Sequence, residues 1–264
     1  MNPSAVRFLL FTYGLTWLLW SPALVNSLRG ETLSPLVIGI GIPGMMVPSI
    51  LGLIFLRREQ KSFREVFASL FTWRWSTWMA IALFLLPLVV TMAHLIHIQF
   101  LGGQAPQIAE PWRIPLAFLT TLIAGGPLFE EIGWRGYLQG KLLTRHSILV
   151  TGILVGIFWG IWHIPLFFIK GMFHEDIPLD QFAITVLLMS VIIVYIQVKA
   201  NAGIWPALLL HTYMNLTQEL TPLFNAQGHR LWTITNGVLA VVILAGLVLH
   251  KRWDLNEKVR AAGV

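Results

Sequence analysis

The segment that decides the fold is residues 114–140, IPLAFLTTLIAGGPLFEEIGWRGYLQG. Its length and apolar character are typical of a helix that crosses a bilayer, since about 20 residues at 1.5 Å rise span the hydrocarbon core. The segment nevertheless carries three ionisable side chains, Glu130, Glu131 and Arg135. An ionised side chain at mid-bilayer costs roughly 2.5 to 3.5 kcal/mol on insertion scales. These groups therefore need partners, access to water or a chemical task.

The rest of the chain has the composition of an integral membrane protein. Hydrophobic residues make up 56% of its 264 residues and charged residues 11%, which is far from the balance of a soluble domain. The chain contains no cysteine, which excludes disulfides, thiolate nucleophiles and thiolate metal ligands. We expect a single membrane domain, 1–264, with a motif-bearing core at about 114–223.

The apolar runs predict an all-α, polytopic membrane bundle of about eight transmembrane helices. The expected spans lie near residues 6–28, 34–56, 76–100, 114–140, 147–170, 181–200, 204–223 and 232–250. Residues 62–75, SFREVFASLFTWRW, alternate apolar and basic side chains at helical spacing. This pattern predicts an interfacial helix between the second and third spans.

Lysine and arginine residues predict the orientation, because loops rich in them stay cytoplasmic. With the N-terminus inside, thirteen of the 18 Lys and Arg residues fall on the cytoplasmic side and four on the other side, leaving only Arg135 within a span. We therefore expect a multi-pass protein with both termini in the cytoplasm. The net charge of +6 then reflects this bias and attraction to the lipid bilayer, and no nucleic-acid partner is needed.

Few titratable groups lie inside the expected spans, and function should be sought among them. They are Glu130, Glu131, Glu219, His94, His97, His163 and His211. On a regular helix Glu131 and Arg135 share a face and can pair. Glu130 points elsewhere, toward the face of Gly126, Gly133 and Tyr137, and is left as the carboxylate free to act.

Two further spans present polar or small residues on one face. Gly152, Gly156 and Gly160 form a stripe that lets another helix approach closely, and His163 continues it. In the seventh expected span, His211, Asn215 and Glu219 follow one another at four-residue spacing. We read Glu219 as a residue at the rim of the bundle.

Three motifs in these spans resemble those of the CAAX protease and bacteriocin-processing (CPBP, or Abi) intramembrane proteases. EEIGWR, residues 130–135, matches the family's EExxxR; WGIWH, residues 159–163, matches FxxxH with Trp159 in place of Phe; and HTYMN, residues 211–215, matches HxxxN. The resemblance implies an eight-helix fold and an intramembrane endopeptidase. It also implies a membrane-associated protein or peptide substrate, such as a prenylated CAAX protein or a bacteriocin leader, and the short chain is similar to bacterial members, which implies a plasma-membrane location.

The resemblance also implies roles for the motif residues. Glu130 is expected to activate water, His163 to share the water's proton, and His211 with Asn215 to bind the oxyanion. Glu131 and Arg135 are expected to support the site, and a purely structural pair is the favoured reading of them. The aromatic ring of Trp159 is expected to pack as Phe does. We expect a water-filled cavity that reaches the cytoplasmic leaflet.

The cofactor and the function class have alternatives. Family members are often described as metalloproteases, and Glu130, His163 and His211 could form a two-His, one-carboxylate zinc site. In such a site Glu130 would be a zinc ligand and would no longer act as the general base, so metal-free hydrolysis is favoured. A non-catalytic scaffold or immunity protein of the same fold is the alternative function. A proton-coupled transporter is less favoured, because no internal repeat is visible.

Overall fold

The computed structural model describes residues 2–59, 62–104, 110–172, 174–175, 177–220 and 226–249. These ranges form helices and connecting turns and contain no strand, so the predicted all-α class is confirmed. The long helices are α1 (Pro3–Leu28), α2 (Pro35–Glu59), α4 (Thr77–Leu101), α8 (Ile148–His163), α9 (Leu179–Ala200), α10 (Trp205–Leu220) and α11 (Ala226–Leu249). The shorter ones are α3 (Phe63–Phe71), α5 (Ile114–Ala124), α6 (Pro127–Glu131), α7 (Gln139–Leu143), a π-helix (Ile132–Leu138) and 3₁₀ turns at Pro111–Arg113 and Ile164–Phe168.

Seven helical segments in the described part of the chain are long and apolar enough to cross a membrane. They correspond to the expected spans except for α10, which has 16 residues. At 1.5 Å per residue α10 is about 24 Å long, shorter than the roughly 30 Å hydrocarbon core. The multi-span bundle is therefore confirmed, and the seventh expected span is a short helix enclosed by its neighbours.

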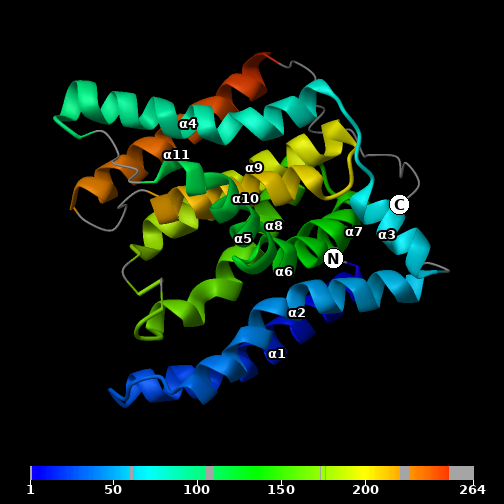
Figure 1. The fold of residues 1–264 in the computed structure, drawn as a ribbon. Helices are drawn as coiled ribbons and strands as arrows, with labels where there is room; N and C mark the ends of the chain where they lie inside the picture. Colours follow the sequence, from blue (N-terminus) through cyan, green and yellow to red (C-terminus); the bar gives the residue numbers. More distant parts are fainter. Residues whose placement is uncertain are drawn as a thin grey trace.

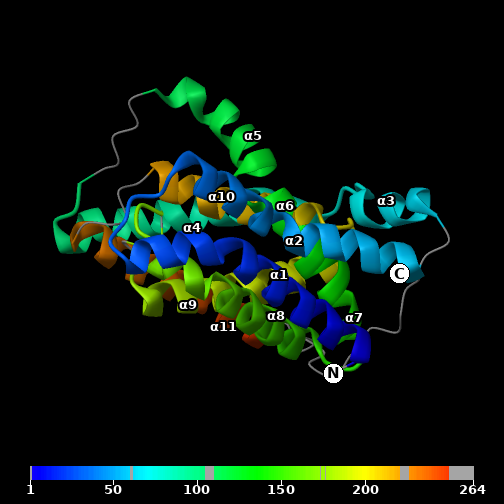
Figure 2. The same ribbon diagram turned by 90° about the horizontal axis from the view of Figure 1, so that it is seen from below.

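Successive long helices run in opposite directions, so the connections between them lie alternately at the two ends of the molecule. The N-terminus, α3 and α7 lie together at one end, and the α1–α2 turn lies at the other (Figure 1, Figure 2). Helices α1 and α2 run side by side along one flank, α4 and α11 along another (Figure 1). Between them α8 packs closely on α9, because a Cβ at Gly152 would come within 2.8 Å of the Val191 backbone. This close approach is the one that the glycine stripe predicts.

Helix α3 is the predicted amphipathic helix between α2 and α4. Ser62 and Glu65 form a capping box at its start, which satisfies two backbone N–H groups that the first turn leaves open. At its other end, the carbonyl of Leu70 accepts the N–H of Ile204 at 2.8 Å. The helix is thus docked on the α9–α10 turn and exposes Phe67. Its place at the membrane interface remains a prediction.

The deciding segment, expected as one continuous helix, is broken in two places. Helix α5 ends before Gly126, whose φ of +109° is accessible to glycine and strained for other residues. After α6 the chain continues as a π-helix, which changes the angle between successive side chains. Gly133 consequently packs on α2, where a Cβ would meet the Pro48 carbonyl oxygen at 2.2 Å, and Tyr137 reaches Glu59. The expectation that both share a face with Glu130 is therefore wrong, and only Gly126 adjoins that carboxylate.

Candidate active site

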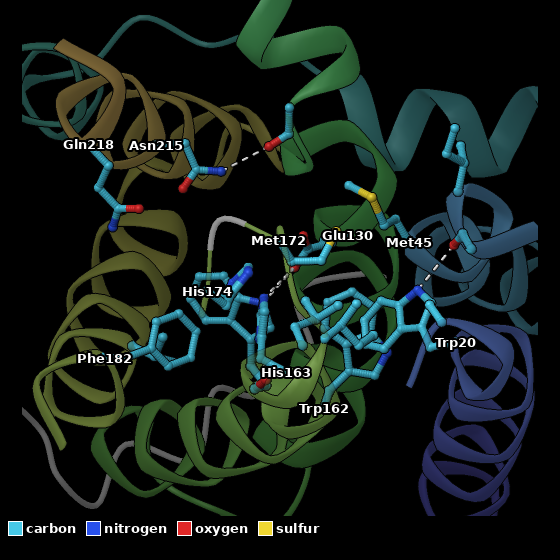
Figure 3. A pocket seen from close by; sticks show the side chains of 18 of the residues that line it. Trp20, Met45, Glu130, Trp162, His163, Met172, His174, Phe182, Asn215 and Gln218 are labelled. Atoms are coloured by element: carbon cyan, nitrogen blue, oxygen red, sulfur yellow. Dashed lines mark hydrogen bonds and ion pairs between the residues drawn. The ribbon is translucent and has the colours of Figure 1, made fainter. Parts of the chain in front are cut away.

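A cavity of about 390 Å³ lies between α1, α2, α8, α9 and α10, and Glu130 on α6 borders it. Most of its lining is apolar or aromatic, which is typical of a site for a ligand with a large apolar part. The polar lining side chains are those of Glu130, His163, His174, His211, Asn215 and Gln218. Figure 3 shows Asn215 and Gln218 on one wall and Trp20 with Met45 on the facing wall.

Glu130 is 4% exposed and has two neighbours beyond its own helix. The indole Nε1–H of Trp159 donates to Glu130 Oε2 at 2.6 Å. His163 Nε2 lies 4.0 Å from the same oxygen. The glycine at position 126 is required here as well, because a Cβ would come within 2.9 Å of Glu130 Oε1.

The hydrogen bond of His163 fixes which ring nitrogen carries the proton. His163 Nδ1 lies 2.8 Å from the carbonyl oxygen of Trp159, and a carbonyl can only accept, so Nδ1 is the donor. In the neutral ring Nε2 is then a lone-pair acceptor. Two acceptors, Glu130 Oε2 and His163 Nε2, thus face each other across a gap that a hydrogen-bonding molecule can bridge.

Glu131 forms a separate charged cluster directly beside this pair. Arg135 Nη1 donates to Glu131 Oε1 at 2.9 Å, and both side chains are fully buried. The predicted pairing of these residues is therefore confirmed. His211 Nδ1 lies 2.7 Å from the same oxygen, a partner that the sequence did not predict. The guanidinium of Arg135 also lies 4.3 Å from the ring centroid of Trp159, which links the two clusters through an indole ring.

Asn215 is held at the cavity wall by the chain break between α5 and α6. Its Nδ2 donates to the carbonyl oxygen of Gly125 at 2.9 Å, as the dashed line in Figure 3 shows. One amide N–H of Asn215 remains beyond this bond. The structure thus brings all four residues expected to be catalytic, Glu130, His163, His211 and Asn215, to one cavity.

Sequence reasoning missed two polar lining residues, Gln218 and His174. Gln218 lies seven residues after His211 and so belongs to the same helix face, a pattern that could have found it. His174 lies in the α8–α9 connection, outside the spans that were searched. Its ring packs 5.5 Å from that of His163, and burial lowers the pKa of His174 to about 4.

Other histidines and acids of the expected spans lie apart from the cavity or outside the description. His94 Nδ1 is bonded to the Val90 carbonyl within α4, and the buried His97 lies against Gly103. Neither residue lines the cavity. The side chain of Glu219 lies outside the described residues.

The described residues contain no group of three or more His, Asp or Glu side chains placed to share a metal ion. His211 directs Nδ1 to Glu131 rather than toward Glu130, and Glu130 and His163 are 4.0 Å apart. Tetrahedral ligands about 2.0 to 2.2 Å from a zinc ion lie closer together than the 4.0 Å between Glu130 Oε2 and His163 Nε2, so these two residues do not form a zinc site as they stand.

Comparison with known proteins places this site in a family. Residues 110–217 match the family described as Type II CAAX prenyl endopeptidase Rce1-like. The chain is also 30% identical to CAAX prenyl protease 2 of Methanococcus maripaludis, over 95% of this chain and 95% of that protein. The chain belongs to the Rce1-like CAAX prenyl endopeptidase family. The resemblance to CPBP intramembrane proteases is thereby confirmed.

The part that matches the Rce1-like family contains all three motifs and the cavity residues that they supply. Membership supports peptidase activity and, with the apolar helices, a multi-pass membrane protein that acts on a membrane-associated substrate. Rce1-like membership does not assign chemical roles to individual side chains of this chain.

Proposed function

We propose that this protein is an intramembrane endopeptidase in which Glu130 and His163 activate a water molecule. The observation that carries the proposal is the 4.0 Å separation of Glu130 Oε2 and His163 Nε2 beside the cavity. A water bound between two acceptors donates one O–H to each of them. Its lone pairs are then free to face a peptide carbonyl carbon that enters from the cavity.

The hydrolysis needs one proton to be moved from the water to the leaving amine. As the water oxygen bonds to the carbonyl carbon, Glu130 takes a proton from it and the carbonyl oxygen becomes an oxyanion. The C–N bond then breaks, and the proton passes from Glu130 to the amine nitrogen. The second proton of the water interacts with His163 Nε2, which orients the nucleophile.

The oxyanion is stabilised from α10. Asn215 has an amide N–H beyond its bond to Gly125, and His211 offers Nε2 on the ring side away from Glu131. Because Nδ1 is bonded to a carboxylate, Nε2 of His211 donates only when the ring carries both protons. Glu131 supplies the negative charge that this imidazolium requires, and donors of this kind stabilise a developing oxyanion strongly in a site away from water.

Substrate reaches the site from the bilayer side of α2. Ile38 and Ile42 line the cavity and are 47% and 51% exposed, so we infer that the cavity is open to the bilayer beside this part of α2. A segment held in the membrane can enter there without crossing bulk water. The substrate class is a membrane-associated polypeptide, with a prenylated C-terminus and a bacteriocin leader as the two kinds to test.

The test compares Glu130→Gln with the wild type, reconstituted with a panel of membrane-anchored peptides. Loss of a general base is expected to lower the cleavage rate by about 100-fold or more, with an unchanged melting temperature. Glu59→Gln is the matched control, because Glu59 contacts Lys141 away from the cavity. Cleavage by Glu130→Gln at the wild-type rate would falsify the mechanism. Normal cellular function of both Glu130→Ala and His163→Ala variants would instead favour the non-catalytic scaffold.

We also infer that the protein sits in a bacterial plasma membrane with both termini in the cytoplasm. Among the described residues, eight Lys and Arg residues lie at the end of the bundle that holds the N-terminus, and four lie at the other end. Arg and Lys near the ends of membrane helices are enriched on the cytoplasmic side. This asymmetry supports the orientation.

A further inference from the structure

Gln218 is a polar side chain of the cavity wall that takes no part in the proposed hydrolysis. It lies in the last turn of α10, and Figure 3 shows it beside Asn215 on the same wall. Within the described part of the chain, the amide of Gln218 forms no hydrogen bond. A side-chain amide carries two N–H donors and one carbonyl acceptor, so Gln218 can bind a polar group that enters the cavity.

A second, smaller cavity of about 30 Å³ adjoins the catalytic one at Met214 and Gln218, which line both. Two hydroxyl groups that line this side cavity already donate within their own helices. Thr217 donates to the carbonyl of Tyr213, and Thr235 donates to the carbonyl of Leu231. The side cavity therefore does not commit the amide of Gln218 to a partner.

His174 is the other polar lining residue without a role in the hydrolysis, and it differs from Gln218 in its contacts. Its ring packs against the rings of His163, Phe167 and Phe182, at centroid distances of 5.5, 5.4 and 5.5 Å. These contacts fix His174 in an aromatic cluster. Gln218 is thus the lining side chain whose hydrogen-bonding groups are left for a ligand.

The spacing of polar residues along α10 matches the spacing of an extended polypeptide. His211, Asn215 and Gln218 lie on one face of the helix, at i, i+4 and i+7. Three residues of helical rise separate Gln218 from Asn215, or about 4.5 Å, whereas an extended chain advances about 3.3 Å per residue. A peptide that lies along α10 with its scissile carbonyl at Asn215 therefore brings a neighbouring residue to Gln218.

A peptide inside this cavity needs partners for its own backbone. Most of the lining is apolar or aromatic, and a backbone N–H or C=O that leaves water without a new hydrogen bond is destabilising. In an extended residue the N–H and the C=O point to the same side of the chain. The amide of Gln218 can accept a hydrogen bond from that N–H and donate one to that C=O.

We propose that Gln218 binds the backbone N–H and C=O of a substrate residue close to the scissile bond. The polypeptide is then held extended along α10, with its scissile carbonyl at Asn215 and the neighbouring residue at Gln218. This makes Gln218 a substrate-binding residue that recognises the main chain of the substrate. The inference rests on the proposed peptidase function.

Gln218→Met tests the role of the amide, because methionine has a similar length and no amide group. The substrate is the membrane-anchored peptide of the panel that the wild type cleaves fastest. We expect kcat/KM to fall about 5- to 10-fold through a higher KM, with kcat changed less than about three-fold, since a backbone contact is shared by the ground state and the transition state. Equal kcat/KM for the variant and the wild type would overturn the inference.

Gln139→Met is the matched control. Gln139 lies in α7, is 3% exposed and lines neither cavity. We expect this substitution to leave kcat/KM unchanged. The melting temperatures of both variants establish that they are folded, and an equal loss of kcat/KM in the two variants would contradict a specific role of Gln218.

An ester scan of the substrate tests whether the contact is with the main chain. One peptide N–H at a time is replaced by an ester oxygen, over three residues on either side of the scissile bond, and the products are identified by mass spectrometry. At one position we expect kcat/KM to fall at least about five-fold for the wild type and less than two-fold for Gln218→Met. Equal losses for the two proteins at every position would reject the backbone contact.

A binding measurement separates this inference from the peptidase function itself. The affinity of Glu130→Gln for the fluorescently labelled panel peptides is compared with that of the double variant Glu130→Gln, Gln218→Met. Binding that depends on Gln218, without cleavage by the wild type, rejects the proposed function alone. Cleavage by the wild type with no dependence on Gln218 in either assay rejects the role of Gln218 alone.

Discussion

At the scale of single residues, Trp159 is the residue whose role differs most from that implied by the family motif. The motif has Phe at this position, and an aromatic ring there could serve packing alone. In this chain the indole donates to Glu130, its backbone carbonyl accepts from His163, and its ring faces Arg135. Trp159 therefore holds the carboxylate in place through a donor that Phe does not have, which makes it a positioning residue.

Replacing Trp159 by Phe removes the donor and keeps most of the ring. A hydrogen bond to a charged group contributes about 1.5 to 3 kcal/mol, so we expect kcat to fall roughly 10- to 100-fold with KM changed less than about three-fold. Steady-state kinetics on a reconstituted peptide substrate measure this split. The pH dependence of kcat is also expected to shift, because the donor contacts the general base directly.

Trp205→Phe is the matched control for this substitution. Trp205 also donates its indole N–H, but to the Phe71 carbonyl at 3.1 Å, away from the cavity. Its loss is expected to leave kcat and the pH profile unchanged. Equal effects of the two substitutions would assign Trp159 to packing only.

Local spacing predicted some residue contacts and missed others for a physical reason. The pair Glu131 and Arg135 was predictable because both partners lie one turn apart on one helix. The bond from His211 to Glu131 joins residues that are 80 positions apart. Such a contact depends on how α6 and α10 cross. The spacing of residues along the chain does not specify that crossing.

At the scale of elements, the break between α5 and α6 creates the site. Straight-helix geometry predicted a continuous span at 114–140, and hydropathy alone cannot distinguish that span from two shorter helices. The adjacent Gly125 and Gly126 marked the break, and Pro127 fits the first turn of the helix that follows. The break leaves the Gly125 carbonyl available to Asn215 and places Glu130 at the start of a new helix.

Gly126→Ala is expected to damage both stability and activity. The φ of +109° at this position disfavours any Cβ, and the added methyl group would meet Glu130 Oε1 at 2.9 Å. Backbone strain of this kind costs about 1 to 3 kcal/mol. We expect a lower melting temperature and at least a ten-fold lower cleavage rate, measured on the purified protein.

Gly140→Ala supplies the control within the same segment. Gly140 lies in α7, and nothing approaches a Cβ there within 4 Å. Helix propensity predicts a gain of about 0.5 to 1 kcal/mol from this change, with an unchanged cleavage rate. If Gly126→Ala behaves like Gly140→Ala, the backbone at position 126 does not set the geometry of Glu130.

At the scale of the whole molecule, composition and hydropathy predicted the helical membrane bundle well. Spans are recognisable because a bilayer requires long apolar helices with satisfied backbones. The depth of the catalytic residues was less predictable, because the cavity depends on which helix ends diverge. The sequence placed Glu130 and His211 nearer the expected cytoplasmic end of their spans, whereas the cavity that they line lies toward the helix ends away from the N-terminus.

Metal dependence is also a property of the assembled molecule, because the candidate ligands come from α6, α8 and α10. The assembled geometry commits His211 to Glu131 and leaves Glu130 beside His163 as a pair of acceptors. A zinc ion at these residues would need Glu130 and His163 to move closer together, although His211 could ligate through Nε2 while Nδ1 keeps its bond to Glu131. We therefore expect cleavage to survive exhaustive treatment with EDTA and 1,10-phenanthroline, with less than a two-fold loss of rate.

Elemental analysis of the purified protein accompanies the assay. One tightly bound zinc per chain whose removal abolishes turnover would contradict the expected metal-free cleavage.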